Sequence, residues 1–264
     1  MISNHLHNIK GLIIDMDGVL WHDTVPLGDL PAIFDRIQAS GLKVILATNN
    51  ATRTIDEYHQ KLRGFGVALE DWQVINSAQA AGMFLQEQYP NGAKVFVVGQ
   101  PSLKATLADL GFTITADDDM TAEVVVGSLD YTVTYEKLKH ASLLIQAGCD
   151  FVGTNPDVTL PTPLGFIPGA GTIIGALEIA SGKSAKIVGK PAPVLYEVAL
   201  KRLQLAPGET LAVGDRLETD IAGAQAAGMH TALVLSGAST RAQAEAFQPP
   251  PEIIAQDLTE LIFE

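Results

Sequence analysis

Two aspartates separated by one residue stand at the end of a short apolar run near the start of the chain. Leu12–Ile14 is followed directly by Asp15-Met16-Asp17-Gly18. Residues i and i+2 of an extended chain point the same way, so both carboxylates project together from the strand's carboxyl end. Two negative charges so close are costly unless a cation or a proton lies between them. The pair therefore predicts a metal-dependent reaction centre, and Gly18 permits the sharp turn that follows it.

Three more strand-like runs end in a polar residue. Thr48 follows an apolar run at 43–47, Lys190 follows one at 186–188, and Asp215 follows one at 211–213. In a doubly wound parallel sheet, ligands bind at the carboxyl edge of the strands. Each of these residues is common at a strand end when taken singly. Because all of them occur together and in this order, we expect them to converge with the two aspartates on one crevice.

Strand-like and helix-like segments alternate along most of the chain, which is typical of the α/β class. We therefore expect a doubly wound parallel sheet. From Ile75 the pattern starts afresh and runs through further strands and helices before the run at 186–188. Helical spacing and end signals predict helices at 31–40, 54–63, 77–89, 101–110, 134–146, 172–180, 194–203 and 221–227.

Composition excludes several classes of protein. The 264-residue chain carries a formal net charge of −13 with scattered basic residues, which argues against nucleic acid and anionic membrane surfaces as partners. A single cysteine excludes an intrachain disulfide framework and Cys-rich zinc sites. No apolar run reaches the ~18–20 residues of a membrane-spanning helix. The first ten residues lack the apolar core of a signal peptide, so we expect a cytoplasmic location.

The four polar strand ends resemble the signature motifs of the haloacid dehalogenase superfamily of phosphotransferases. The motifs are Asp15–Trp21 (DMDGVLW), Thr48-Asn49-Asn50, Gly189-Lys190-Pro191 and Gly214–Asp220 (GDRLETD). The long segment between the second and third motifs looks like that family's large α/β cap. Together with the stretch TNPD at 154–157 and PGAG at 168–171, it is similar to the branch that contains 4-nitrophenylphosphatases and phosphoglycolate phosphatases.

This resemblance implies a division of the chain. Residues 1–77 and 185–264 form a Rossmann-like catalytic core, and residues 78–184 form the inserted α/β cap. Hinges are expected near Ser77 and at 183–185, where the pattern restarts. The Pro- and Gly-rich stretch 155–171 is the best candidate for the cap surface that faces the site, although such stretches are often only turns.

The resemblance also assigns roles to the carboxylates. Asp15 is the nucleophile that forms an aspartyl-phosphate, and Asp17 is the general acid and base. A Mg²⁺ ion is held by Asp15, by the backbone carbonyl of Asp17 and by Asp215, because this hard cation prefers oxygen ligands. Asp220 is either a partner behind these ligands or an ordinary N-cap of the helix 221–227.

The same resemblance assigns phosphate binding to other residues. Thr48 offers a hydroxyl hydrogen bond and Lys190 a positive charge to the phosphoryl oxygens. Backbone N–H groups near Gly18 and Asn49 add donors.

Residues outside the phosphate site receive weaker assignments. In the cap, Asn155 and Asp157 are candidates for choosing the substrate. The Trp21 ring is expected to pack beside the site, because nothing requires it in the chemistry.

The predicted function is Mg²⁺-dependent hydrolysis of small phosphomonoesters such as sugar phosphates, phosphoglycolate-like acids or nucleotides. Two alternatives stay open. A phosphomutase or phosphotransferase would pass the same aspartyl-phosphate to an alcohol, and a receiver-like module would hold it without turnover. The expected partner is a small phosphorylated metabolite, with neither nucleic acid nor membrane, and a homo-oligomer is left open.

Overall fold

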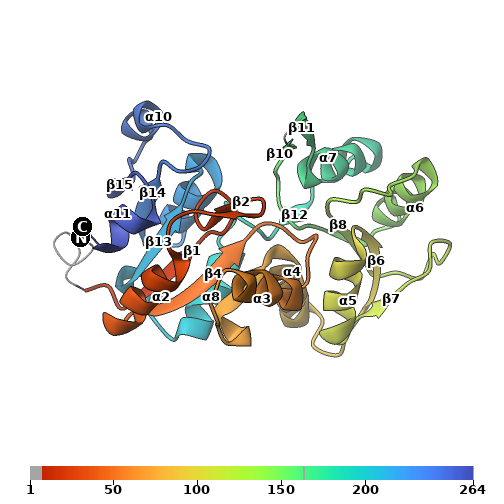
Figure 1. Ribbon diagram of the computed structural model, residues 1–264. Coiled ribbons are helices and arrows are strands. Elements are labelled where there is room, and N and C mark those ends of the chain that lie inside the picture. The colour runs from red at the N-terminus through yellow and green to blue at the C-terminus, as the bar shows by residue number, and fades with distance from the viewer. Residues whose placement is uncertain (1–7, 163, 264) are drawn as a thin grey trace. The chain divides into compact units, whose positions relative to one another are not determined.

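The chain divides into two compact units, each with its own parallel sheet. The computed structural model describes residues 8–162 and 164–263. The first unit comprises Met1–Thr48, Ile55–Ile75 and Lys190–Glu264, and the second comprises Asn49–Thr54 and Asn76–Gly189. Figure 1 labels the elements and colours them from red at the N-terminus to blue at the C-terminus. Among the helices of the described residues, none is long and apolar enough to cross a membrane.

A six-stranded sheet forms the centre of the first unit. Strand β1 is fully buried and pairs in parallel with β4 on one side and β13 on the other. Burial on both faces explains why its sequence is a continuous apolar run. The strand order is β15 (Ile253–Ala255), β14 (His230–Val234), β13 (Thr210–Gly214), β1 (Gly11–Ile14), β4 (Lys43–Thr48) and β5 (Val74–Asn76).

Helices of the first unit bury one apolar face each. Helix α2 starts where the Asp29 side chain accepts a hydrogen bond from the Ala32 N–H, and it buries Leu30, Ile33 and Ile37. A small hairpin of β2 (Trp21–His22) and β3 (Val25–Pro26) follows β1. The helices are α2 (Leu30–Ala39), α3 (Ile55–Gly64), α8 (Val194–Leu203), α9 (Ala222–Ala226), α10 (Arg241–Ala246) and α11 (Leu258–Phe263), with short 3₁₀ turns at Asp71–Gln73 and Pro207–Glu209.

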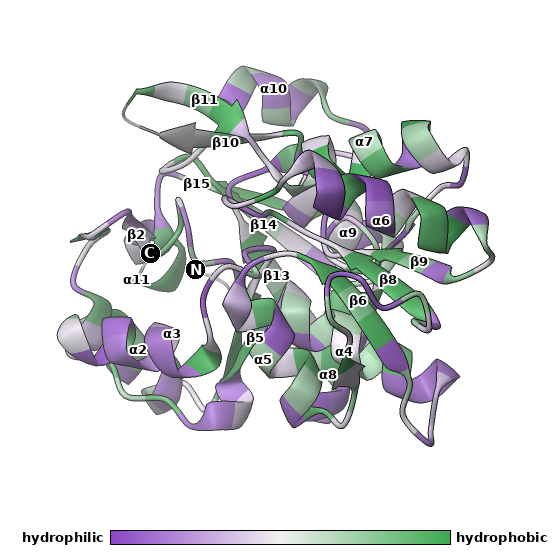
Figure 2. Cartoon of the chain, turned by 90° about the vertical axis from the view of Figure 1, so that its right-hand side faces the viewer, coloured by the Kyte–Doolittle hydropathy of each residue, from purple (hydrophilic) through white to green (hydrophobic). Residues whose placement is uncertain are grey.

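The second unit repeats the α/β plan around a five-stranded parallel sheet. Its strand order is β12 (Lys186–Ile187), β9 (Asp150–Gly153), β8 (Val124–Gly127), β6 (Lys94–Val98) and β7 (Thr113–Ile114). Figure 2 shows β6, β8 and β9 in the green of apolar residues, as expected for strands buried on both faces. The helices are α4 (Ser77–Gln88), α5 (Pro101–Asp109), α6 (Tyr135–Gln146) and α7 (Ala170–Ser181), and an antiparallel hairpin joins β10 (Thr159–Thr162) to β11 (Gly165–Pro168).

The predicted fold class, a doubly wound parallel α/β sheet with a second α/β unit inserted, is confirmed. The functional division into a core and a cap stays a prediction. Strand β12 departs from expectation, because it pairs with β9 in the second unit although the sequence places 185–264 in the core. Lys190 therefore opens the last segment of the first unit and does not end a strand of that unit's sheet.

The helix predicted at 221–227 also differs from the observed structure. The chain first forms a π-turn at Leu217–Ile221 and then the short helix α9, whose N-cap residue Ile221 makes no side-chain cap hydrogen bond. The N-cap role considered for Asp220 is therefore wrong. Its carboxylate instead accepts from the N–H groups of Asp215 and Arg216, the two residues that precede the π-helical segment Leu217–Ile221.

Candidate active site at the carboxyl edge of the first sheet

Three neighbouring strands of the first unit end at the same edge with a polar residue. Ile14 lies opposite Val213 in the β1–β13 pair and opposite Leu46 in the β1–β4 pair. The next residue, Asp15, donates its N–H to the carbonyl of Val213 at 2.8 Å. Asp215 follows the last residue of β13, and Thr48 is the last residue of β4. The parallel register thus brings these strand ends together, as the sequence predicts.

Lys190 supplies the positive charge of the cluster. Its Nζ donates to Asp15 Oδ1, to Asp220 Oδ1 at 2.6 Å and to the carbonyl of Ala47 at 3.0 Å. The lysine is 2% exposed. Burial by itself would lower the pKa of Lys190, but the carboxylates of Asp15 and Asp220 outweigh this effect and raise it well above its usual value. Lys190 is therefore a charged lysine, aligned by three oxygen acceptors.

Asp220 lies behind the other two carboxylates. Its Oδ2 accepts from the backbone N–H of Asp215 at 3.2 Å and of Arg216 at 3.0 Å, while Oδ1 accepts from Lys190. The Tyr196 hydroxyl donates to its backbone carbonyl at 2.9 Å. Because both carboxylate oxygens already accept hydrogen bonds, Asp220 orients Asp215 and Lys190.

Asp215 offers a buried oxygen that lacks a partner. Its Oδ2 accepts from the Ala238 N–H at 2.7 Å, whereas Oδ1 is buried and has no hydrogen-bond partner among the described residues. Burial raises the pKa of Asp215 to about 6, and the charge of Asp220 adds to the effect. An unpaired buried carboxylate oxygen is costly in the absence of a cation.

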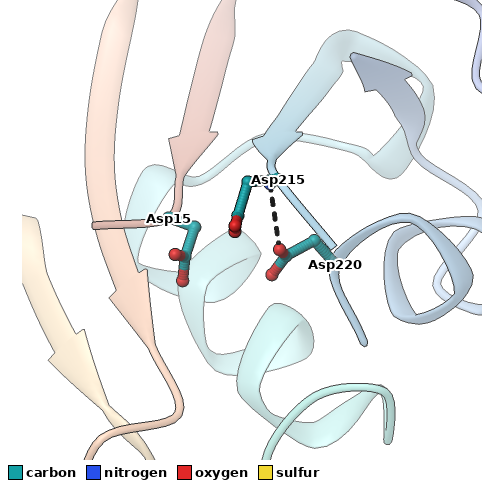
Figure 3. A group of neighbouring side chains, drawn as sticks. All are labelled: Asp15, Asp215 and Asp220. Carbon is teal, nitrogen blue, oxygen red and sulfur yellow. Dashed lines mark hydrogen bonds between the residues drawn. The ribbon is translucent and has the colours of Figure 1, made fainter. Parts of the chain in front are cut away.

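The three carboxylates have a donor set that fits a divalent metal ion. Asp15, Asp215 and Asp220 each bring one carboxylate oxygen to within 4.8 Å of the others, and Figure 3 shows the three groups gathered from separate elements. Burial raises the pKa of Asp15 well above its usual value; Asp220 and Asp215 raise it further, and Lys190 opposes them. The three carboxylates outnumber Lys190, which contacts two of them, so the group carries negative charge when all three are ionised. A hard cation that prefers oxygen ligands, such as Mg²⁺, would neutralise this charge. Both oxygens of Asp220 accept hydrogen bonds, whereas Asp215 Oδ1 has no partner among the described residues, so Asp15 and Asp215 are the side chains that fit best as ligands.

Gly18 makes the close approach of two loops feasible. Its φ is +87°, and a Cβ atom there would lie 2.6 Å from Asp215 Oδ2. Its carbonyl accepts a hydrogen bond from the Ser236 hydroxyl at 2.7 Å. The neighbouring Asp17 is exposed, and its Oδ1 accepts from the indole N–H of Trp21 at 2.8 Å. The Trp21 ring, expected only to pack beside the site, thus also makes a polar contact with Asp17.

The predicted phosphate and cap residues are distributed between the two units. Thr48 is 3% exposed in the first unit. Asn49, the next residue, belongs to the second unit, where its side chain donates to Asp157 Oδ2 at 3.3 Å. Its carbonyl accepts from Asn155 Nδ2 at 2.9 Å and from the Ser77 hydroxyl. Asn155 and Asp157 thus contact Asn49, and their predicted part in substrate choice stays a prediction.

A loop that the strand-end pattern did not single out contacts Asp215. Residues 236–239 follow β14 and hold Asp215 through the Ala238 N–H, while the Ser239 N–H donates to the Asp215 carbonyl at 3.0 Å. The signal was present, because Ser236 and Gly237 follow an apolar strand in the same way as Thr48 and Asp215 do.

Two family models match separate parts of the chain. Residues 12–113 match the model described as haloacid dehalogenase-like hydrolase, and residues 187–261 match one described as HAD-hydrolase-like. Together they cover more than half of the sequence and include all four motifs. The chain belongs to the haloacid dehalogenase-like hydrolase family. The predicted resemblance is thereby confirmed.

Individual relatives specify the type of hydrolase. An acid sugar phosphatase of Staphylococcus aureus is 35% identical over 255 residues, which cover 97% of each chain. The p-nitrophenyl phosphatase from Archaeoglobus fulgidus has a TM-score of 0.90 at 31% identity, covering 97% of this chain and 98% of that one. A glycerol phosphate phosphatase from Mycobacterium tuberculosis, solved in complex with magnesium, has a TM-score of 0.88 at 35% identity, covering 96% and 76%. The predicted enzyme class, a phosphatase of this family, is confirmed.

Proposed function

We propose that this protein hydrolyses small phosphomonoesters, sugar phosphates among them, with Mg²⁺ and through an aspartyl-phosphate on Asp15. The observation that carries the proposal is the buried Oδ1 of Asp215, which has no hydrogen-bond partner among the described residues and belongs to the same carboxylate group as Asp15, to which Lys190 donates. The substrate class is supported by the acid sugar phosphatase relative. Use of Mg²⁺ is supported by the relative solved with magnesium and by the all-oxygen donor set.

The first half-reaction transfers the phosphoryl group to the enzyme. A carboxylate oxygen of Asp15 forms a bond to phosphorus as the bond from phosphorus to the substrate oxygen breaks, and Asp17 gives that oxygen a proton. Lys190 holds the Asp15 carboxylate in place and carries a positive charge next to the reacting group. Asp15 and Asp215 would hold the ion, which supplies positive charge against the repulsion between carboxylate and phosphate.

The second half-reaction releases phosphate. Water forms a new bond to phosphorus, the bond from phosphorus to Asp15 breaks, and Asp17 takes up the proton that the water loses. Inorganic phosphate leaves, and both aspartates return to their starting states. Thr48 and the N–H groups near Gly18 and Asn49 are proposed to bind the phosphoryl oxygens.

The proposal is tested by phosphate release from 4-nitrophenyl phosphate and a panel of sugar phosphates, with Mg²⁺ and with EDTA. We expect turnover only with the metal. Asp15→Asn should abolish it with the fold intact, and Asp35→Asn, an exposed aspartate on α2, should leave it unchanged. Failure of the wild-type protein to release phosphate from any substrate would refute the proposal.

The same experiment separates the alternatives. Transfer of the phosphoryl group to an added alcohol without free phosphate would establish a phosphotransferase. A stable phosphoaspartate without turnover would establish a receiver-like module. The cytoplasmic location and the small-metabolite partner stay predictions.

A further inference from the structure

Trp21 makes a specific polar contact with the proposed acid and base. Its indole Nε1–H donates to Asp17 Oδ1 at 2.8 Å. The backbone supports the same arrangement, because the Gly18 N–H donates to the Trp21 carbonyl at 2.8 Å and a β-bridge joins Asp17 to Trp21. The loop therefore returns on itself and brings the indole next to the carboxylate.

The Trp21 indole is buried, whereas the Asp17 carboxylate is exposed. Trp21 is 0% exposed and belongs to the main apolar core of the first unit. Its ring centroid lies 5.8 Å from that of Phe65, and Lys61 Nζ lies over the ring at 3.9 Å from the centroid. An exposed aspartate would otherwise sample several rotamers. The hydrogen bond thus joins the exposed Asp17 carboxylate to a buried donor and favours one orientation of it.

An indole N–H donates and cannot accept a hydrogen bond. The oxygen that it contacts, Oδ1, therefore acts as an acceptor, and Oδ2 is left to carry the proton that passes to the leaving oxygen. We infer that Trp21 is a positioning residue that orients the Asp17 carboxylate so that Oδ2 serves as the acid in phosphoryl transfer. This inference rests on the proposed function, which assigns the acid role to Asp17.

A leaving-group comparison tests the inference. Trp21→Phe keeps an aromatic ring and removes the N–H. We compare kcat/KM for 4-nitrophenyl phosphate, whose leaving group needs little protonation, with kcat/KM for an alkyl phosphate that the wild-type protein hydrolyses. We expect a loss of about tenfold or more for the alkyl phosphate and of less than about threefold for the nitrophenyl ester. Trp72→Phe is the matched control, because Trp72 is 42% exposed, and it should change neither value.

Each outcome has a clear meaning. Equal losses on both substrates, or no loss, would overturn the inference, since a purely structural role does not distinguish leaving groups. If the wild-type protein hydrolyses neither ester, the proposed function fails instead. Should Trp21→Phe not fold, benzothienyl-alanine can replace Trp21 in the Trp72→Phe background. This isostere keeps the bicyclic ring and lacks the N–H, and the same substrate-dependent loss is expected.

Discussion

Lys190 Nζ lies 2.6 Å from Asp220 Oδ1, and both side chains are buried. The same ammonium group donates to Asp15, and the same carboxylate accepts from the N–H groups of Asp215 and Arg216. One ion pair thus connects the proposed nucleophile to the loop that carries the proposed metal ligand. Disturbing either partner should affect both.

Lys190→Met should destabilise the protein and remove its activity. The substitution leaves Asp15 and Asp220 without their buried cation, and breaking such a pair costs about 3–5 kcal/mol in the free energy of unfolding. We expect kcat to fall by about 100-fold or more, because a charged donor next to the phosphoryl group is lost. Denaturant unfolding and phosphate release measure the two effects.

A double variant separates stability from catalysis at this pair. Lys190→Met/Asp220→Asn removes one of the two uncompensated charges and leaves that of Asp15, so it should regain part of the lost stability without regaining activity. Lys10→Met is the control, since it removes an exposed ion pair with Glu209 and should leave both measurements close to wild type. An active Lys190→Met enzyme would contradict the role given to this lysine.

Asp17→Asn should slow turnover of alkyl phosphates by about 10²–10⁴-fold, because the general acid and base is removed. Phosphoenzyme, where it forms, should persist, and intact-mass measurement of rapidly quenched protein would detect it. Asp23→Asn is the control, since Asp23 is exposed in the β2–β3 hairpin and asparagine tolerates its φ of 48°. Near-wild-type turnover of Asp17→Asn would remove the acid and base role.

Asp215 should make stability depend on pH when no metal is bound. Its pKa of about 6 lies above the usual value, so the folded state keeps a proton that the unfolded chain has already lost. The free energy of unfolding should therefore fall between about pH 4 and about pH 6, by about 3 kcal/mol, and stay lower above that range. Thermal unfolding in EDTA across this range measures the slope.

Substitution and metal addition test the same carboxylate. In EDTA above about pH 6, Asp215→Asn should be more stable than wild type, because no buried charge has to form. Mg²⁺ should reverse this order by binding wild type alone. Asp119→Asn is the control, because hydrogen bonds from Thr121 lower the pKa of the Asp119 carboxyl, which is the opposite direction to Asp215. Equal stabilisation of wild type and Asp215→Asn by Mg²⁺ would contradict the ligand role.

Gly237→Ala should weaken metal binding through Asp215. A Cβ atom at Gly237 would lie 2.0 Å from Asp215 Oδ2, so the carboxylate would have to move away from the Ala238 N–H. We expect the Mg²⁺ concentration for half-maximal activity to rise about tenfold. Gly208→Ala, where no described atom beyond the chain neighbours lies within 4 Å of the added Cβ, should leave it unchanged. Unaltered metal dependence of Gly237→Ala would show that the loop does not fix Asp215.

The polar residues at the strand ends could be predicted to lie together, because their positions depend on local sequence patterns. Asp15, Thr48 and Asp215 each follow an apolar run, and parallel pairing brings the ends of such runs to one edge. Lys190 lies beside Asp15 as expected, but the pattern that led to this expectation was incomplete. The strand before it pairs in the second unit, and the residue reaches Asp15 from the start of the next segment.

The fold class, the family motifs and the aspartates at the sheet edge could be predicted from the sequence, because apolar runs and the residues that end them are local properties. The hydrogen-bonding environment of each carboxylate, in contrast, depends on tertiary contacts. Both oxygens of Asp220 accept hydrogen bonds, Asp215 has a buried oxygen without a partner in the described part of the chain, and Asp17 accepts from Trp21. Asp215 accepts from Ala238 and Asp220 accepts from Lys190, which lie 23 and 30 residues away, so no local pattern encodes these two contacts. The contact between Asp17 and Trp21 spans only four residues, but it depends on the packing of the buried indole in the core.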